Sequence, residues 1–171
     1  MVRHGRQAAH LPRLLEIAGA SSTAAIAAAA LVGPAQVGAR LVEFGALRWV
    51  HPLVSARIAT VLHPIGALAL AAIGPAAITA FALFHGAGNG MLTIAKGTLP
   101  LAIFGPVGYG LRSGVLAAPA RAAQAAAPLI FGILMEHLGV GVLGVSAGIS
   151  FAALLTLMAL KAAATPAAVP A

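Results

Sequence analysis

Two pairs of polar residues stand inside apolar stretches of this chain, at spacings that suit chemistry on a helix. His85 and Asn89 are four residues apart, and Arg121 and Gln124 are three apart. Residues at these spacings share one helix face. An imidazole beside a carboxamide can hold a polar substrate or relay a proton, and a guanidinium can hold an anionic substrate. These four residues are therefore the candidate substrate-binding residues.

The chain lacks the residues that several other kinds of chemistry require. The chain has no cysteine, which excludes disulfides and thiol catalysis. It has no Asp, and its three acids, Glu16, Glu43 and Glu136, are far apart in the sequence, so no carboxylate pair is expected for acid–base catalysis. The six histidines do not have the spacing of a metal cluster. We therefore expect no enzyme activity, no metal and no cofactor.

The elements that must position the candidate residues are membrane-length helices. The chain is 61% hydrophobic and 8% charged, whereas a typical soluble domain is roughly 25% charged. A membrane-crossing helix needs about 20 mostly apolar residues. Five stretches of this kind are residues 21–38, 55–73, 75–95, 113–135 and 140–160. The sequence predicts an all-α, multi-pass transmembrane helix bundle of about five helices.

Within a membrane, each candidate pair also has a structural explanation. His85 and Asn89 can form a hydrogen bond between helices and touch no substrate, because polar groups in lipid need partners. Arg121 can lie near the cytoplasmic interface and anchor its helix there, with its charge in water. The sequence leaves both explanations open.

The charge of the chain indicates an orientation rather than a nucleic-acid partner. The formal net charge is +7, but the basic residues are scattered, and one Trp and one Tyr offer little stacking on bases. Lys and Arg collect in alternate connections, and cytoplasmic loops are rich in these residues. We expect a lipid bilayer as partner, no nucleic acid, and a location in the cell inner (plasma) membrane with the C-terminus in the cytoplasm.

Several stretches together resemble the C-terminal half of a major facilitator superfamily (MFS) transporter, from about its eighth to its twelfth helix. They are "HLPRLLEIAGAS" (10–21), "GPAQVGARLVEFGALR" (33–48) and residues 86–132, which begin "GAGNGMLTIAKG". The resemblance implies three parts. Residues 1–20 are a remnant of the junction after the seventh helix, residues 21–160 form the transmembrane half, and residues 161–171 are a flexible cytoplasmic tail.

The resemblance also implies roles for particular residues. Gly38, Arg40, Glu43, Gly45 and Arg48 approximate the family's cytoplasmic loop motif, in which the acid pairs with Arg or with a helix N-terminus. An ordinary solvated loop explains the same charges. In this family the tenth helix borders the central cavity, and that helix would carry His85 and Asn89. The helix of His63 would lie at the periphery, which favours a packing role for this residue.

The resemblance implies secondary transport of a small-molecule substrate by alternating access, with proton-coupled export as one form. The first half of an MFS transporter has no counterpart here, so we expect a truncated protein or a fragment. The missing N-terminal half, or a second copy of the chain, would then be a partner. The alternative is a non-transporting integral membrane helix bundle or assembly protein.

Overall fold

The computed structural model describes residues 10–160, and this part of the chain is all-α. The predicted tail, residues 161–171, and the first nine residues of the predicted N-terminal segment lie outside it. The α-helices are α1 (His10–Ile17), α2 (Ser22–Gly45), α3 (Pro52–Ile73), α4 (Ile78–Phe104), α5 (Tyr109–Leu138) and α6 (Val142–Ala159). Short 3₁₀ helices are η1 (Leu47–Trp49), η2 (Gly74–Ala77) and η3 (Gly139–Gly141).

Local sequence signals set where these helices begin and end. The Ser21 hydroxyl accepts a hydrogen bond from the Ala24 N–H at 3.3 Å, which caps α2. The α4–α5 turn contains Gly105 and Gly108, with φ of 71° and 67°. Glycine adopts positive φ without a steric penalty, so the chain reverses here within four residues.

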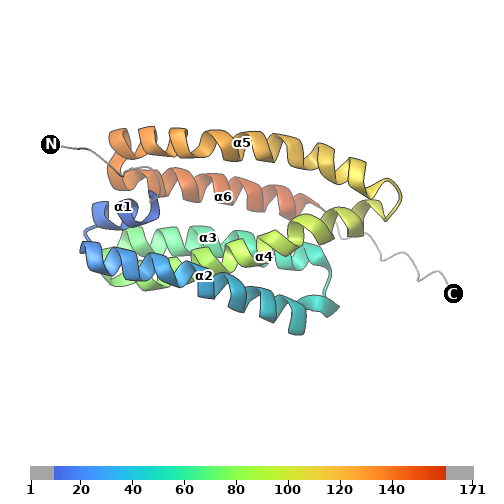
Figure 1. Cartoon of the computed structure of the whole chain (residues 1–171), viewed down its shortest axis with the longest axis horizontal. Helices are drawn as coiled ribbons and strands as arrows, with labels where there is room; N and C mark the ends of the chain where they lie inside the picture. The colour runs from blue at the N-terminus through green and yellow to red at the C-terminus, as the bar shows by residue number, and fades with distance from the viewer. Residues whose placement is uncertain (1–9, 161–171) are drawn as a thin grey trace.

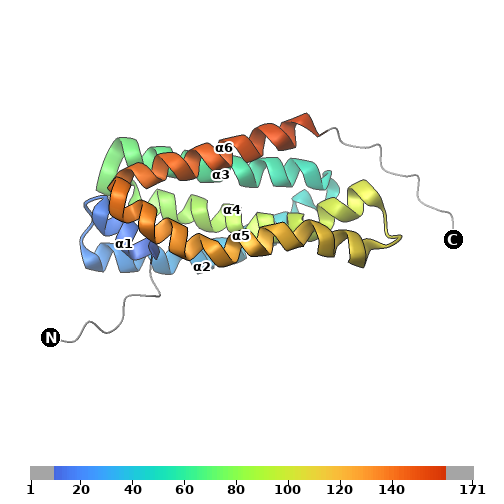
Figure 2. The ribbon, with the colours of Figure 1, turned by 90° about the horizontal axis from the view of Figure 1, so that it is seen from above.

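The long helices run side by side along one axis (Figures 1 and 2). Helix α4 packs against both α2 and α3, and α6 lies along α3. Helix α5 packs much more sparsely, and Met135 is its one buried residue. One well-packed group of helices therefore stands beside one loosely attached helix.

The expected count of five separate spans needs correction. The described residues contain three continuous helical stretches that are long and apolar enough to cross a membrane: Ser22–Gly45, Pro52–Phe104 and Tyr109–Ala159. The last two are 53 and 51 residues long because the expected loops at their centres are the helical turns η2 and η3. Each of these two stretches folds back on itself as a pair of α-helices (Figure 1).

Three helices extend well past one of their predicted ends. Helix α2 continues to Gly45, α4 continues to Phe104, and α5 begins at Tyr109. Arg40, Lys96 and Arg112 therefore lie on helices, whereas the sequence placed them in connecting segments. Charged residues near the end of a long helix do not mark where the helix stops.

Large apolar side chains cover the outside of the bundle, and small residues fill much of its inside. Trp49, Leu129 and Leu41 are 81%, 71% and 67% exposed. Buried positions include many alanines, such as Ala25, Ala59 and Ala82. In water so much exposed apolar surface would be unfavourable, and small residues at helix contacts are typical of membrane bundles.

Three glycines of α4 let its neighbours approach closely. A Cβ added at Gly86 would lie 2.6 Å from the Val32 carbonyl oxygen, and one at Gly90 would lie 2.5 Å from that of Gln36. Both oxygens belong to the backbone of α2. A Cβ at Gly88 would collide with the ring of His63 on α3. The "GAGNG" stretch therefore holds α2 and α3 against α4.

Arginine side chains close two helix C-termini. Arg57 of α3 donates to the carbonyl oxygens of Leu157 (3.0 Å from Nη2) and Leu160 (2.8 Å) at the end of α6. Arg112 of α5 donates to the Phe104 carbonyl oxygen at 2.6 Å, at the end of α4. The last carbonyls of a helix lack intrahelical partners and carry partial negative charge, so cations stabilise them.

Replacing Gly90 by Ala should destabilise the bundle by about 1–3 kcal/mol, because the added methyl meets the α2 backbone, which has no free rotation to yield. Gly38→Ala is the matched control, since nothing lies within 4 Å of a Cβ there. The control should be neutral or stabilising by up to about 1 kcal/mol through helix propensity. Unfolding followed by circular dichroism in detergent measures both. Equal midpoints for the two variants would show that the contact with α2 is not tight.

Replacing Arg57 by Met should loosen the end of α6, because the side chain keeps its bulk and loses every donor. The loss of hydrogen bonds from a charged group should cost about 1.5–3 kcal/mol. Hydrogen exchange of the backbone amides in the last turn of α6 should become faster. Arg40→Met, at an exposed position of α2, is the control and should leave α6 unchanged. Identical exchange in both variants would contradict the capping role.

Candidate functional site

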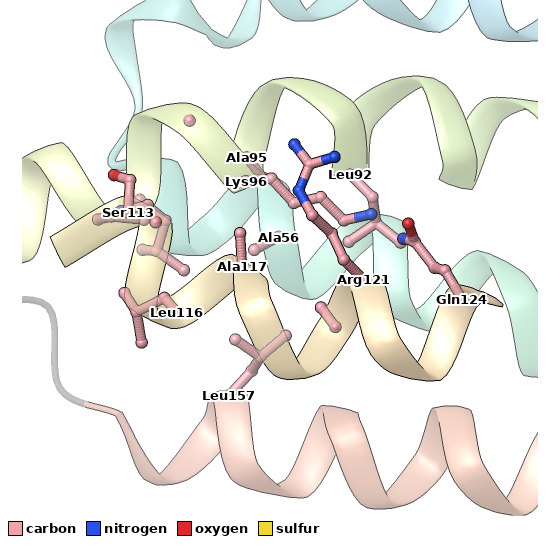
Figure 3. A pocket seen from close by; sticks show the side chains of 15 residues that line it. Ala56, Leu92, Ala95, Lys96, Ser113, Leu116, Ala117, Arg121, Gln124 and Leu157 are labelled. Carbon is pink, nitrogen blue, oxygen red and sulfur yellow. The ribbon is translucent and has the colours of Figure 1, made fainter. Parts of the chain in front are cut away.

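A cavity of about 700 Å³ lies between α4 and α5. Ala56 of α3 and Leu157 of α6 also line it (Figure 3). Its polar side chains are Lys96 from α4 and Ser113, Arg121 and Gln124 from α5. The other lining residues are apolar or glycine, among them Leu92, Ala95, Leu99, Leu116, Ala117 and Ala120. The volume falls within the range of about 300–1,000 Å³ that small-molecule sites occupy.

Helical spacing brings the polar residues to this cavity. Arg121 and Gln124 are three residues apart on α5, so they share a face. Lys96 shares a face of α4 with Leu92, four residues earlier. Figure 3 shows the polar ends of Lys96, Arg121 and Gln124 between α4 and α5, at one end of the cavity, with Ser113 towards the other end. The cavity thus has a cationic end and an apolar body.

The two cations have no acidic partner in the cavity. The chain contains three acids, Glu16, Glu43 and Glu136, and none of them lines it. At about 1.5 Å per residue, Arg121 lies about 18 Å along the axis from the start of α5, near the middle of the helix. The cavity role and the interface-anchor role of Arg121 both remain predictions. Both cationic side chains are exposed, and two positive charges with no acid beside them attract an anion.

A second polar cluster joins α3 and α4. The Nε2 atom of His63 lies 3.4 Å from Oδ1 of Asn89. The rings of His63 and His85 pack edge to face with centroids 5.2 Å apart, and Phe81 stacks on His85 at 5.7 Å. Both histidines line a smaller cavity of about 180 Å³. Gly88 makes room for this arrangement, since any larger residue there would meet the His63 ring.

The partners of His63 link its tautomer to the orientation of the Asn89 amide. Its Nδ1 lies 3.0 Å from the Ala59 carbonyl oxygen, so both ring nitrogens face oxygen atoms. A neutral imidazole has one N–H and can donate to only one of the two oxygens. A doubly protonated ring donates to both, and a neutral ring is satisfied at both nitrogens when the amide turns its NH₂ group towards Nε2.

The four predicted substrate-binding residues do not form one site. Arg121 and Gln124 line the large cavity and His85 lines the small one. Asn89 contacts His63 instead of lining either cavity. The sequence interpretation of His63 as a packing residue missed its polar partners. No group of three potential metal ligands occurs among residues 10–160.

Lys96 is the functional candidate that the sequence analysis left out. The sequence places Lys96 in a connecting segment, because the predicted apolar stretch 75–95 ends one residue before it. A usable signal was present, since a lysine inside an apolar helix usually faces a cavity or a partner. Arg121 is 25 residues away in the sequence, so only the folded hairpin of α4 and α5 brings Lys96 and Arg121 to the same cavity.

The predicted cytoplasmic loop motif is mostly helical. Gly38, Arg40, Glu43 and Gly45 all lie in α2, and Arg48 lies in η1. Glu43 is 7% exposed, and its Oε2 has no hydrogen-bond partner among the side chains that the structure describes. Nothing is described of the Arg48 side chain. The predicted pairing of the acid therefore remains a prediction.

Comparison of the chain with protein-family models, curated proteins and solved structures finds no match. The arguments about function consequently rest on the two cavities, on the polar groups in them and on the apolar helices around them.

The contact between His63 and Asn89 predicts a small but measurable coupling. In a double-mutant cycle with His63→Ala and Asn89→Ala, the two losses of stability should be non-additive by about 0.5–1 kcal/mol, as is common for polar pairs in membrane bundles. Unfolding in detergent gives the four free energies. A parallel cycle of His63 with Thr93, which bonds only to its own helix, should be additive. Additivity in both cycles would remove the link between α3 and α4.

Proposed function

We propose that the chain is an integral membrane protein that takes part in secondary transport of a small molecule. In this proposal α2 crosses the bilayer once, and the α3–α4 and α5–α6 pairs each cross it twice. The length of the helical stretches and their exposed apolar side chains support this arrangement.

The observation that carries the proposal is the polar-ended cavity between α4 and α5. Ionisable residues within membrane helices are costly and commonly mark substrate pathways. Transport by alternating access needs a binding site near the middle of the membrane, between elements that can move relative to one another. Two features support the proposal. Arg121 lies near the middle of α5, which would place it near the middle of the membrane, and α5 packs sparsely against its neighbours, which would let it move.

Membership of the MFS is the finer part of the proposal, with this chain as a C-terminal half. A missing N-terminal half or a second copy would complete the transporter. The basic residues Arg57, Lys96 and Arg112 lie towards the end of the bundle that carries the α4–α5 turn. By the positive-inside tendency that end faces the cytoplasm, which sets the orientation in the inner membrane.

The second candidate is a non-transporting helix-bundle or assembly protein. The exposed apolar side chains of α5 favour it, among them Leu111, Leu129 and Ile130. A neighbouring helix could cover this face as well as lipid does. The same cavity would then separate α5 from the bundle without binding a substrate.

A flux measurement separates these two functions. Vesicles containing the purified chain are loaded with benzenesulfonate, trimethylphenylammonium or glucose, which are small anionic, cationic and neutral probes that cross lipid slowly. We expect faster release of at least one probe than from protein-free vesicles. Ala117→Phe, which fills the cavity, should reduce the release at least tenfold, and Ala118→Phe, next to the cavity residue but outside it, should not. Release equal to that of protein-free vesicles for all three probes would favour the assembly role.

A further inference from the structure

We infer that the cavity between α4 and α5 binds an amphipathic organic anion, with the acidic head between Lys96 and Arg121 and the apolar body against the remaining lining. The inference rests on the proposed function, because it names the substrate class of the same cavity. It makes a separate claim about equilibrium binding.

Charge is the first step of the argument. Lys96 and Arg121 line one cavity, and none of the three acids in the chain lines it with them. Charged groups within apolar surroundings persist when they are paired or hydrogen-bonded. A bound anion pairs with these two cations, which no acid of the chain does in this cavity. A cationic ligand would add a third positive charge and be repelled.

The hydrogen-bonding groups are the second step. The Arg121 guanidinium presents donors in a planar fork that matches a carboxylate or sulfonate, and Lys96 adds an ammonium group. Gln124 brings an amide to the same end of the cavity (Figure 3). The hydroxyl oxygen of Ser113 lines the cavity without a hydrogen-bond partner among the described residues. The cavity thus offers several donors and no negative charge.

The apolar lining is the third step. The cavity has apolar walls formed by Leu92 of α4, Leu116 of α5 and Leu157 of α6. A purely polar anion would gain no binding free energy from these walls. Burial of apolar surface is worth about 25 cal/mol per Å², so a ligand with a hydrocarbon body gains affinity that phosphate or sulfate lacks. A volume of about 700 Å³ admits a molecule larger than an inorganic ion.

Two sources can supply this chemistry: a free organic acid from either aqueous side, or an anionic phospholipid whose chain enters between sparsely packed helices. Both present one negative head on an apolar body. The experiment therefore includes an arm for each source.

The test measures equilibrium binding of 2-naphthalenesulfonate to the full chain in phosphatidylcholine nanodiscs by saturation-transfer NMR, with empty nanodiscs as background. The neutral amide, 2-naphthalenesulfonamide, is the matched ligand, and it should bind at least tenfold more weakly. Arg121→Gln and Lys96→Gln should each weaken binding of the anion about tenfold or more, since a hydrogen bond to a charged group is lost. Arg121→Lys keeps the charge and loses the fork, so it should weaken binding less than Arg121→Gln does.

Arg112→Gln is the matched control, because it removes a positive charge from the same helix at a position outside the cavity. It should leave binding of the anion unchanged. Equal binding of sulfonate and sulfonamide, or equal losses in Arg121→Gln and Arg112→Gln, would overturn the inference. Helicity measured by circular dichroism confirms that each variant is folded.

The lipid arm replaces part of the phosphatidylcholine with phosphatidylglycerol. Competition that lowers naphthalenesulfonate binding in wild type, together with Arg121-dependent retention of phosphatidylglycerol in native mass spectrometry, identifies a lipid as the anion. Unchanged naphthalenesulfonate binding identifies a free organic acid. Transport of a cationic or neutral probe without binding of the sulfonate would overturn this inference and leave the proposed function standing. Binding of the sulfonate without flux of any probe would leave this inference standing and overturn the proposed function.

Discussion

Close contact at Gly86 and Gly90 lets the α2 backbone lie against α4, with only the small Ala35 side chain beside Gly86. Gly88 does the same for the His63 ring on α3. In apolar surroundings the hydrophobic effect gives helices little reason to associate, so close packing and internal hydrogen bonds must hold them together. The α2–α3–α4 group depends on this constraint, and the His63–Asn89 contact can exist because the backbones approach so closely.

Helix α5 is not held by close backbone contacts of this kind. Its glycines Gly110 and Gly114 have open space where a Cβ would be, so they do not draw a neighbouring backbone close. The hairpin turn at Gly105 and Gly108 and the hydrogen bond from the Tyr109 hydroxyl to the Gly97 carbonyl oxygen, 3.0 Å long, fix one end of α5 against α4. Beyond that end the two helices leave the large cavity between them. The space arises from a helix held at its ends and not packed along its length.

The sequence predicted the helices better than it predicted the contacts between side chains of different helices. Apolar stretches of about 20 residues correctly indicated apolar helices of membrane-spanning length, because helix length and apolar composition are local properties, but the count of five separate spans was wrong. The turns at η2 and η3 were expected as loops, since a 3₁₀ turn and a loop draw on the same Gly and Pro residues. Shared faces predicted which residues of one helix act together, as with Arg121 and Gln124. Whether His63 contacts Asn89, or Lys96 lines the same cavity as Arg121, depends on the rotation and register of the helices, and no short-range sequence pattern carries that information.

The composition of α5 bears on why a cation lies in its middle. An arginine at the centre of a membrane helix costs about 2.5–3.5 kcal/mol on insertion scales, and each Leu, Ile, Phe or Val contributes about −0.3 to −0.6 kcal/mol. The nine such residues of α5 therefore contribute about −3 to −5 kcal/mol. Gln124 and two internal prolines, Pro119 and Pro128, add further cost, so Arg121 cancels most of what the apolar residues provide. A leucine in its place would make a more stable helix, whereas a cation turned towards a cavity that also contains Lys96 makes a site for negative charge.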